Sequence, residues 1–199
     1  MGGTSSGRRV LCVSGSLRAA SANTAILRTA IDVAPQAVDG EQIGCHIYDR
    51  LSVLPAYNPD DDHDQLHPEV RRLRDSIHEA AGILFSTPEY AGALPGSLKN
   101  LLDWTIGDDR SGSIYGKPVG WVNTSPRGST SAYRELETVL GYAHANIVQA
   151  ACVSLPIAAT MIGPDGLVAD ASARQTLAGV LAELLAAPTG NGEEGGAAS

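Results

Sequence analysis

Residues 15–23 combine a cation, two hydroxyls and an amide in a short stretch that begins with glycine. The polar side chains are those of Ser16, Arg18, Ser21 and Asn23. An apolar run precedes the stretch and a helical pattern follows it. It is therefore expected at a helix N-terminus, where backbone N–H groups and the helix dipole favour an anion. An arginine can contact a phosphate through two hydrogen bonds. The spacing fits neither the dinucleotide nor the ATP fingerprint, and the alternative is an ordinary turn capped by Ser21 or Asn23.

A second loop, residues 87–94, follows another buried apolar run. Pro88 and Gly92 are expected to shape a tight turn, whose free N–H groups can reach the polar edge of a heterocycle. Tyr90 offers an aromatic surface beside them, with a half-buried loop aromatic as the alternative. Trp104, in the helix that follows, is expected to pack in the core.

These loops need strands and helices to position them. Short apolar runs predict strands at residues 8–14, 42–48, 82–87, 118–123 and 147–155. Apolar residues at helical spacing predict helices at residues 23–34, 65–80, 95–106, 130–143 and 171–186, and residues 51–64 are expected to form a polar loop. The alternation predicts an α/β fold in three layers, with a doubly wound, five-stranded parallel sheet. In the order 2-1-3-4-5, the loops after the first, third and fourth strands meet in one crevice.

The composition predicts one soluble domain, residues 8–187, with flexible tails at residues 1–7 and 188–199. The formal net charge of −8 argues against a nucleic acid or an anionic membrane as a partner. We also expect no membrane anchor, because no apolar run is long enough to span a bilayer and the N-terminus lacks the apolar region of a signal peptide.

The other chemically active side chains are interpreted as structural. The cysteines, which are expected to be buried, reduced thiols of a cytoplasmic protein, are Cys12, Cys45 and Cys152. The acidic run at residues 60–64 lacks the alternation of a calcium loop, so a solvated loop is expected and no metal site. No serine or cysteine partner is evident for the scattered histidines, which are His46, His78 and His144.

Residues 15–23, G-S-L-R-A-A-S-A-N, resemble the G-S-x-R-x-x-S-x-N turn of the NAD(P)H-dependent FMN reductase family, which also includes quinone, azo-dye and chromate reductases. Residues 88–104, P-E-Y-A-G-A-L-P-G-S-L-K-N-L-L-D-W, resemble that family's P-E-Y-N-x-x-x-P-G-x-L-K-N-x-x-D-W segment almost throughout. The departure is Ala91, which stands where the family usually has Asn and removes any contact made by that amide. The resemblance covers about residues 8–155 and implies a flavodoxin-like fold.

The resemblance also implies FMN as the bound cofactor. The residues that it assigns to FMN are Ser16, Leu17, Arg18, Ser21, Ala22, Asn23, Pro88, Glu89, Tyr90, Ala91 and Ser125. The first six belong to the phosphate loop, the next four to the turn that holds the isoalloxazine ring, and the last to a third loop beside the ring. Arg127, also in that third loop, either attracts the phosphates of a nicotinamide dinucleotide or is simply solvated.

The activity implied by the resemblance is that of an NAD(P)H oxidoreductase. NAD(P)H, the co-substrate, passes hydride to N5 of FMN, and a small acceptor such as a quinone, free flavin, azo compound or metal oxyanion then takes the electrons. Because the chemistry takes place on FMN, no side chain is expected to be catalytic. A homodimer or homotetramer is implied, because the ring in this family lies close to a subunit interface. The alternatives are a flavodoxin-like electron carrier, against which Arg18 argues, and a non-catalytic protein. The latter either binds FMN or is a ligand-sensing or scaffold member that has lost FMN, which Ala91 leaves open.

Overall fold

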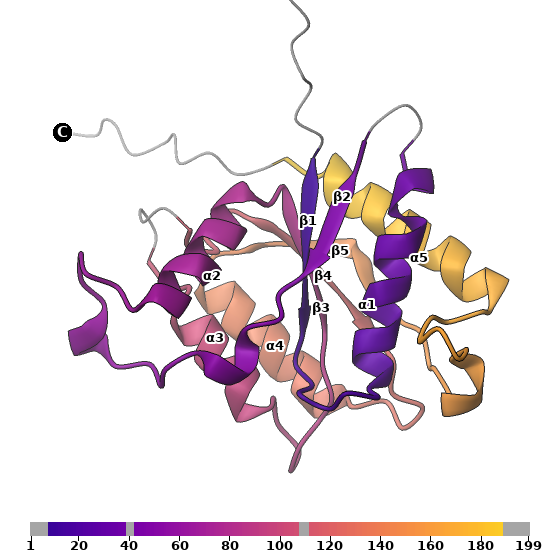
Figure 1. The fold of residues 1–199 in the computed structure, drawn as a ribbon, viewed down its shortest axis with the longest axis horizontal. Coiled ribbons are helices and arrows are strands. Elements are labelled where there is room, and N and C mark those ends of the chain that lie inside the picture. Colours follow the sequence, from indigo (N-terminus) through magenta and orange to yellow (C-terminus); the bar gives the residue numbers. More distant parts are fainter. Residues whose placement is uncertain (1–7, 39–41, 108–111, 189–199) are drawn as a thin grey trace, which may run out of the picture.

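The computed structural model describes residues 8–38, 42–107 and 112–188, which form an α/β fold around a five-stranded parallel sheet (Figure 1). The strands are β1 (Arg9–Ser14), β2 (Gly44–Ile47), β3 (Gly82–Ser86), β4 (Pro118–Asn123) and β5 (Asn146–Ser154). The helices are α1 (Ala22–Val33), α2 (Pro68–Glu79), α3 (Gly96–Asp103), α4 (Thr130–Tyr142) and α5 (Ala171–Ala186). The strand order is β2-β1-β3-β4-β5, so the predicted flavodoxin-like topology is confirmed.

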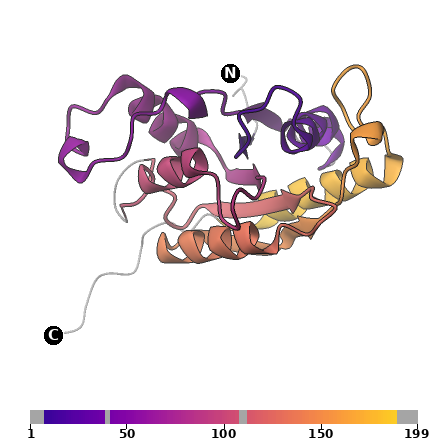
Figure 2. The ribbon, with the colours of Figure 1, turned by 90° about the horizontal axis from the view of Figure 1, so that it is seen from below.

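Two apolar cores lie on opposite faces of the sheet, because successive residues of a strand point to opposite faces. In β1, Val10 and Cys12 belong to the core formed with α1 and α5, whereas Leu11 and Val13 belong to the core formed with α2, α3 and α4. The two sets of helices accordingly flank the sheet in both ribbon views (Figures 1 and 2). Burial on both faces explains why β1 and β3 read as continuous apolar runs in the sequence.

The carboxyl ends of the central strands lie at one edge of the sheet. Ser14, the last residue of β1, is in register with Ser86, the last residue of β3. On the other side of β3, Phe85 is in register with Trp121 of β4. The loops after β1, β3 and β4 therefore begin side by side, as predicted.

Some predicted boundaries were wrong. The helix expected from residue 65 begins at Pro68, because proline suits the first helical position and His67 Nδ1 accepts a hydrogen bond from Glu69 N. The expected polar loop at residues 51–64 contains two short 3₁₀ turns, at Leu51–Val53 and Pro59–Asp61.

The sequence predicted a solvated loop for the acidic run at residues 60–64, but one of its side chains is largely buried. Asp62 and Arg74 form a two-pronged ion pair of 3.0 Å, and each side chain is only 9% exposed. Arg74 also donates to the carbonyl of Trp104, through Nε at 3.1 Å and Nη2 at 3.0 Å. This pair ties the acidic loop to α2 and to the end of α3.

The tails predicted at the two ends of the chain lie outside the described residues, apart from Pro188, whose carbonyl accepts a hydrogen bond from Asn146 Nδ2. Among the helices that the structure describes, none is both long and apolar enough to cross a membrane.

Candidate functional site

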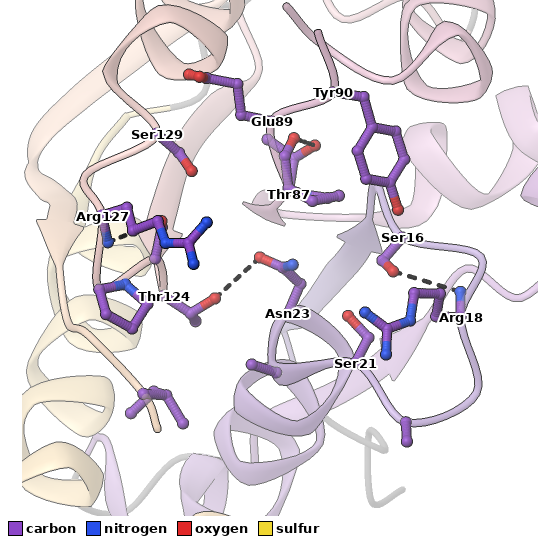
Figure 3. Close-up of a pocket in the computed structure, with 16 residues that line it drawn as sticks. Ser16, Arg18, Ser21, Asn23, Thr87, Glu89, Tyr90, Thr124, Arg127 and Ser129 are labelled. Carbon is purple, nitrogen blue, oxygen red and sulfur yellow. Dashed lines mark hydrogen bonds between the residues drawn. The ribbon is translucent and has the colours of Figure 1, made fainter. Parts of the chain in front are cut away.

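A pocket of about 520 Å³ opens at the carboxyl edge of the sheet, between the loops after β1, β3 and β4 (Figure 3). Its size is typical of a site for a cofactor or small ligand. The lining residues are Ser16, Arg18, Ala20, Ser21, Ala22, Asn23, Thr87, Pro88, Glu89, Tyr90, Thr124, Ser125, Pro126, Arg127, Ser129 and Ile157.

The first loop lies tightly against the second. Gly15 N donates to Ser86 O at 2.9 Å, and a Cβ at Gly15 would overlap the hydroxyl of Thr87. Only glycine therefore allows this approach. Beyond Gly15, Ser16 Oγ accepts a hydrogen bond from Arg18 N at 3.3 Å, which turns the loop towards α1.

The N-terminus of α1 faces the pocket without a side-chain cap. Ser21 is at the N-cap position in extended conformation, yet its side chain makes no capping hydrogen bond to the described residues. Asn23 does not cap either, because its Oδ1 accepts hydrogen bonds from Ser86 Oγ at 2.9 Å and Thr124 Oγ1 at 3.0 Å. Its amide nitrogen faces the pocket instead (Figure 3). The ordinary capped turn considered as an alternative is therefore not what forms.

Arg18 supplies a charge at the same place. Its guanidinium is turned back across the loop towards Ser21 (Figure 3). Within the described part of the chain, this guanidinium has no hydrogen bond or ion pair. The cation, the hydroxyls of Ser16 and Ser21 and the first N–H groups of α1 together form a donor set that suits a phosphate monoester.

The second loop is a tight two-residue hairpin. Tyr90 N donates to Ala93 O at 3.0 Å and Ala93 N to Tyr90 O at 3.1 Å, while Ala91 and Gly92 have φ values of 51° and 77°. Two successive positive φ angles are typical of a type I′ turn. Tyr90 is 48% exposed, and its ring lies over the part of the pocket formed by Ser16 (Figure 3).

Glu89 holds α4 in place. Its Oε2 accepts hydrogen bonds from Ser131 N and Ala132 N, both at 3.0 Å, in the first turn of that helix. A carboxylate here satisfies free N–H groups and complements the helix dipole. The backbone of Glu89 reaches the pocket, as expected, but its charge is directed to α4.

Tyr133 joins the ends of β3 and β4 beneath the pocket. Its hydroxyl accepts a hydrogen bond from Thr87 N at 3.1 Å and donates one to Val122 O at 2.9 Å. Burial raises the pKa of Tyr133 to about 12, although the hydrogen bond from Thr87 opposes this shift. The phenol is therefore a neutral link at physiological pH.

The third loop is closed by Asn123 at the end of β4. Its Oδ1 accepts from Ser125 N at 3.0 Å and its Nδ2 donates to Gly128 O. Ser125 Oγ then accepts from Arg127 N at 3.2 Å. The loop thus has a defined backbone, and Arg127 lies at its tip.

Nine of the eleven residues assigned to FMN from the sequence line this pocket, and two do not. Leu17 is 58% exposed and lines a neighbouring hollow with Arg28 and Asp49. Ala91 lies in the hairpin turn and does not line the pocket.

Sequence reasoning missed several lining residues, among them Thr87, Thr124, Ser129 and Ile157. The two threonines directly follow β3 and β4, and a hydroxyl at the carboxyl end of a parallel strand was the available signal. Ile157 carried no such signal, because an apolar residue after β5 is indistinguishable from core.

The described part of the chain contains no cluster of side chains suited to a metal ion. No group of three or more His, Cys, Asp or Glu side chains is gathered there in a way that would hold a metal ion. The three cysteines are free thiols. Cys12 is fully buried, as expected, whereas Cys45 and Cys152 are only partly buried. Burial still raises the pKa of Cys45 to about 11 and that of Cys152 to about 12.

Comparison with known proteins identifies the relatives of this chain. NADPH:quinone oxidoreductase of Arabidopsis thaliana is 43% identical over 118 residues, which are 58% of this chain and 57% of that protein. An NAD(P)H-dependent FMN reductase of Pseudomonas aeruginosa is 36% identical over 117 residues, which are 59% and 60% of the two chains. The matches thus span less than two thirds of these relatives.

A solved structure and a family model extend the likeness. FerB, a flavoenzyme NAD(P)H:acceptor oxidoreductase of Paracoccus denitrificans, superposes with a TM-score of 0.70 at 28% identity, over 90% of this chain and 96% of that one. The model of the NADPH-dependent FMN reductase family matches residues 8–160, which contain all three loops of the pocket. The chain therefore belongs to the NADPH-dependent FMN reductase family.

Proposed function

We propose that this chain is an FMN-dependent NAD(P)H oxidoreductase that passes electrons to a small acceptor such as a quinone. The observation that carries the proposal is Arg18 beside the N-terminus of α1, at the carboxyl edge of the sheet. Among the described residues, the guanidinium of Arg18 has no partner and this helix N-terminus has no side-chain cap. Family membership supports the same activity, as do the names of the plant quinone oxidoreductase and the bacterial FMN reductase.

The pocket fits FMN at both of its ends. Ser16, Arg18, Ser21 and the first N–H groups of α1 hold the phosphate. Pro88 and Tyr90 of the second loop flank the ring, for which the half-exposed phenol provides an aromatic surface. When bound, FMN supplies the redox chemistry, accepting hydride from NAD(P)H and giving electrons to the acceptor.

In this scheme, the side chains of the pocket bind and orient FMN and the substrates, and the redox chemistry takes place on FMN. Among the described residues that line the pocket, Glu89 is the one carboxylate, and it is engaged by the N–H groups of α4. No histidine or cysteine is among them. We therefore assign no side chain a role as general acid or base.

Anaerobic mixing of the FMN-loaded protein with NADPH, and separately with NADH, tests the activity. Loss of the visible flavin absorbance, followed by its return when a quinone is added, is the expected result. A flavin that stays oxidised with both nucleotides would favour an electron carrier instead. A colourless protein that gains no flavin band with added FMN would overturn the assignment of FMN.

We further propose one domain at residues 8–187 that acts in the cytoplasm as a homodimer or homotetramer. The free thiols of all three cysteines support a reducing compartment. The large apolar side chains of Leu17 and Tyr90 are about half exposed on the loops after β1 and β3, which supports a covered edge beside the pocket. Light scattering on the purified protein measures the subunit number, and a monomer would contradict the assembly.

A further inference from the structure

Two arginines enter the pocket from opposite rims. Arg18 comes from the loop after β1 and Arg127 from the loop after β4, and Asn23 lies between the two guanidinium groups (Figure 3). Within the described part of the chain, neither guanidinium forms an ion pair or a hydrogen bond. The described residues therefore use neither charge for an ion pair or a hydrogen bond.

The turn that carries Arg127 is fixed by its own hydrogen bonds. Asn123 accepts a hydrogen bond from Ser125 N and donates one to Gly128 O. Ser125 Oγ accepts a hydrogen bond from Arg127 N. The chain leaves this turn through Gly128 at φ 95°. A defined backbone thus presents an exposed guanidinium at the mouth of the pocket.

The two arginines of the pocket are not paired with a carboxylate in the described part of the chain. The one carboxylate among the described residues that line the pocket belongs to Glu89, which is turned to the start of α4. FMN brings a single phosphate, for which the loop of Arg18 is suited. Arg127 lies on the opposite rim and so remains available to a second anionic ligand, although the formal net charge of the protein is −8. Cations gathered in a concave site attract anionic substrates.

We propose that Arg127 binds a phosphate of the nicotinamide dinucleotide and so contributes to its recognition. This inference rests on the proposed function, since it requires a dinucleotide to enter the same pocket. The dinucleotide carries a pyrophosphate and, in NADPH, a 2′-phosphate, both of which match the two-pronged donor geometry of arginine. The position of Arg127, on the rim away from the FMN phosphate loop, leaves it accessible to a ligand that arrives from solvent.

Steady-state kinetics of Arg127→Ala test this role. The expected result is a KM for the dinucleotide that rises about 10- to 100-fold, the effect typical of a lost charged hydrogen bond, with kcat unchanged. Arg127→Lys keeps the charge but loses the planar guanidinium, so its KM for the dinucleotide should lie between those of the wild type and Arg127→Ala. Arg134→Ala is the matched control, because Arg134 is an exposed residue of α4 that does not line the pocket. An Arg127→Ala variant with the KM of Arg134→Ala would overturn the proposal.

The choice of nucleotide distinguishes the two phosphates. If Arg127 binds the 2′-phosphate, the KM of Arg127→Ala rises for NADPH alone; if it binds the pyrophosphate, the KM values for NADPH and NADH rise together. Either result supports a phosphate contact. A changed FMN affinity or reduction potential with an unchanged KM would instead place Arg127 against the flavin and overturn the proposal.

A binding measurement separates this inference from the proposed function. Calorimetric titration of the FMN-loaded protein with oxidised NADP⁺ requires no turnover, and Arg127→Ala should weaken binding by the same factor as the KM. If wild-type protein binds NADP⁺ through Arg127 but NADPH leaves the flavin oxidised, the activity fails and the phosphate contact stands. If NADPH reduces the flavin but NADP⁺ binds wild-type and Arg127→Ala equally, the activity stands and the contact fails.

Discussion

The loop after β1 and the loop after β3 line the same pocket, but their polar groups have different partners. In the first loop, the guanidinium of Arg18 and the hydroxyl of Ser21 are not engaged by the described residues. In the second loop, Glu89 caps α4 and Thr87 N donates to Tyr133 OH. Glu135 of α4 completes this attachment by accepting Leu94 N at 2.7 Å. The first loop is thus open towards a ligand, whereas the second is bound into the scaffold.

The same contrast continues into α3. The K-N-x-x-D-W part of the second motif places Asn100 and Trp104 one turn apart, and both donate to the carbonyl of Pro55 at 2.9 Å. Asn100 also accepts Tyr57 N at 2.7 Å. Two motifs that are equally recognisable in a sequence therefore serve different purposes. Substitution of Arg18 in the first motif should change ligand affinity, whereas substitution of Asn100 or Trp104 in the second should change stability.

Arg18→Ala gives the largest expected effect. Loss of a charge-assisted contact should weaken FMN binding by about 1.5–3 kcal/mol, or roughly 10- to 150-fold. The free energy of unfolding of the apoprotein should change by less than about 0.5 kcal/mol, because the guanidinium has no partner among the described residues. Fluorescence titration with FMN and urea unfolding measure the two quantities. Arg134→Ala, at an exposed position of α4 that does not line the pocket, is the control, and equal FMN affinity in the two variants would remove Arg18 from the site.

Tyr133→Phe tests the scaffold under the second loop. The substitution leaves the buried N–H of Thr87 without its partner, so the free energy of unfolding at pH 7 should fall by about 1–3 kcal/mol.

The pH dependence gives an independent readout for the same residue. The pKa of Tyr133 is raised to about 12 in the folded protein, against about 10 when unfolded, so the unfolded state loses its proton first. The contribution of Tyr133 to the free energy of unfolding is therefore complete below pH 10 and is lost as the pH rises towards 12. Urea titrations across this pH range should show that the free energy of unfolding falls less steeply for Tyr133→Phe than for the wild type. Burial also raises the pKa of Tyr48, which contributes equally to both proteins. Identical declines would exclude Tyr133 as the source.

Glu89→Gln should have a smaller effect on the same scaffold. The amide oxygen still accepts from the first turn of α4, but the negative charge that complements the helix dipole is lost. We expect the free energy of unfolding to fall by about 0.5–1 kcal/mol, with FMN affinity nearly unchanged. Thermal melts and FMN titrations check this, with Glu137→Gln on the exposed side of α4 as the control. A large loss of FMN affinity at unchanged stability would show that Glu89 serves the ligand.

The fold was predictable because its signals are local. β1, β3 and β4 are continuous apolar runs that end at serine or asparagine, and the helices between them keep one apolar face. The ion pair between Asp62 and Arg74 was not predictable in this way, because neither residue's neighbours in sequence reveal that they meet in a buried contact.

In the candidate site, too, the features with a local sequence pattern were predictable and the contacts between distant loops were not. The residues of the first loop were predictable, because cations and hydroxyls at the start of a helix are a local anion-binding pattern. The bonds from Ser86 and Thr124 to Asn23 were not, because they join three loops that meet only through the strand order. Glu89 illustrates the limit most clearly: its place beside the pocket was correct, but its partner lies 42 residues further along the chain.

Ala91 offers the smallest and most discriminating test of the contrast between the two loops. An alanine at φ 51° is strained, and asparagine followed by glycine is the preferred sequence for a type I′ turn. Ala91→Asn should therefore raise the free energy of unfolding by about 0.5–1 kcal/mol. Ala91→Val should lower it, because a branched side chain is worse in this conformation. If the turn only supports the scaffold, thermal melts will separate the two variants while their FMN affinities stay equal. If Ala91→Asn tightens FMN binding without raising the melting temperature, the added amide contacts the ring, and the second loop then holds the ligand with its side chains as the first one does.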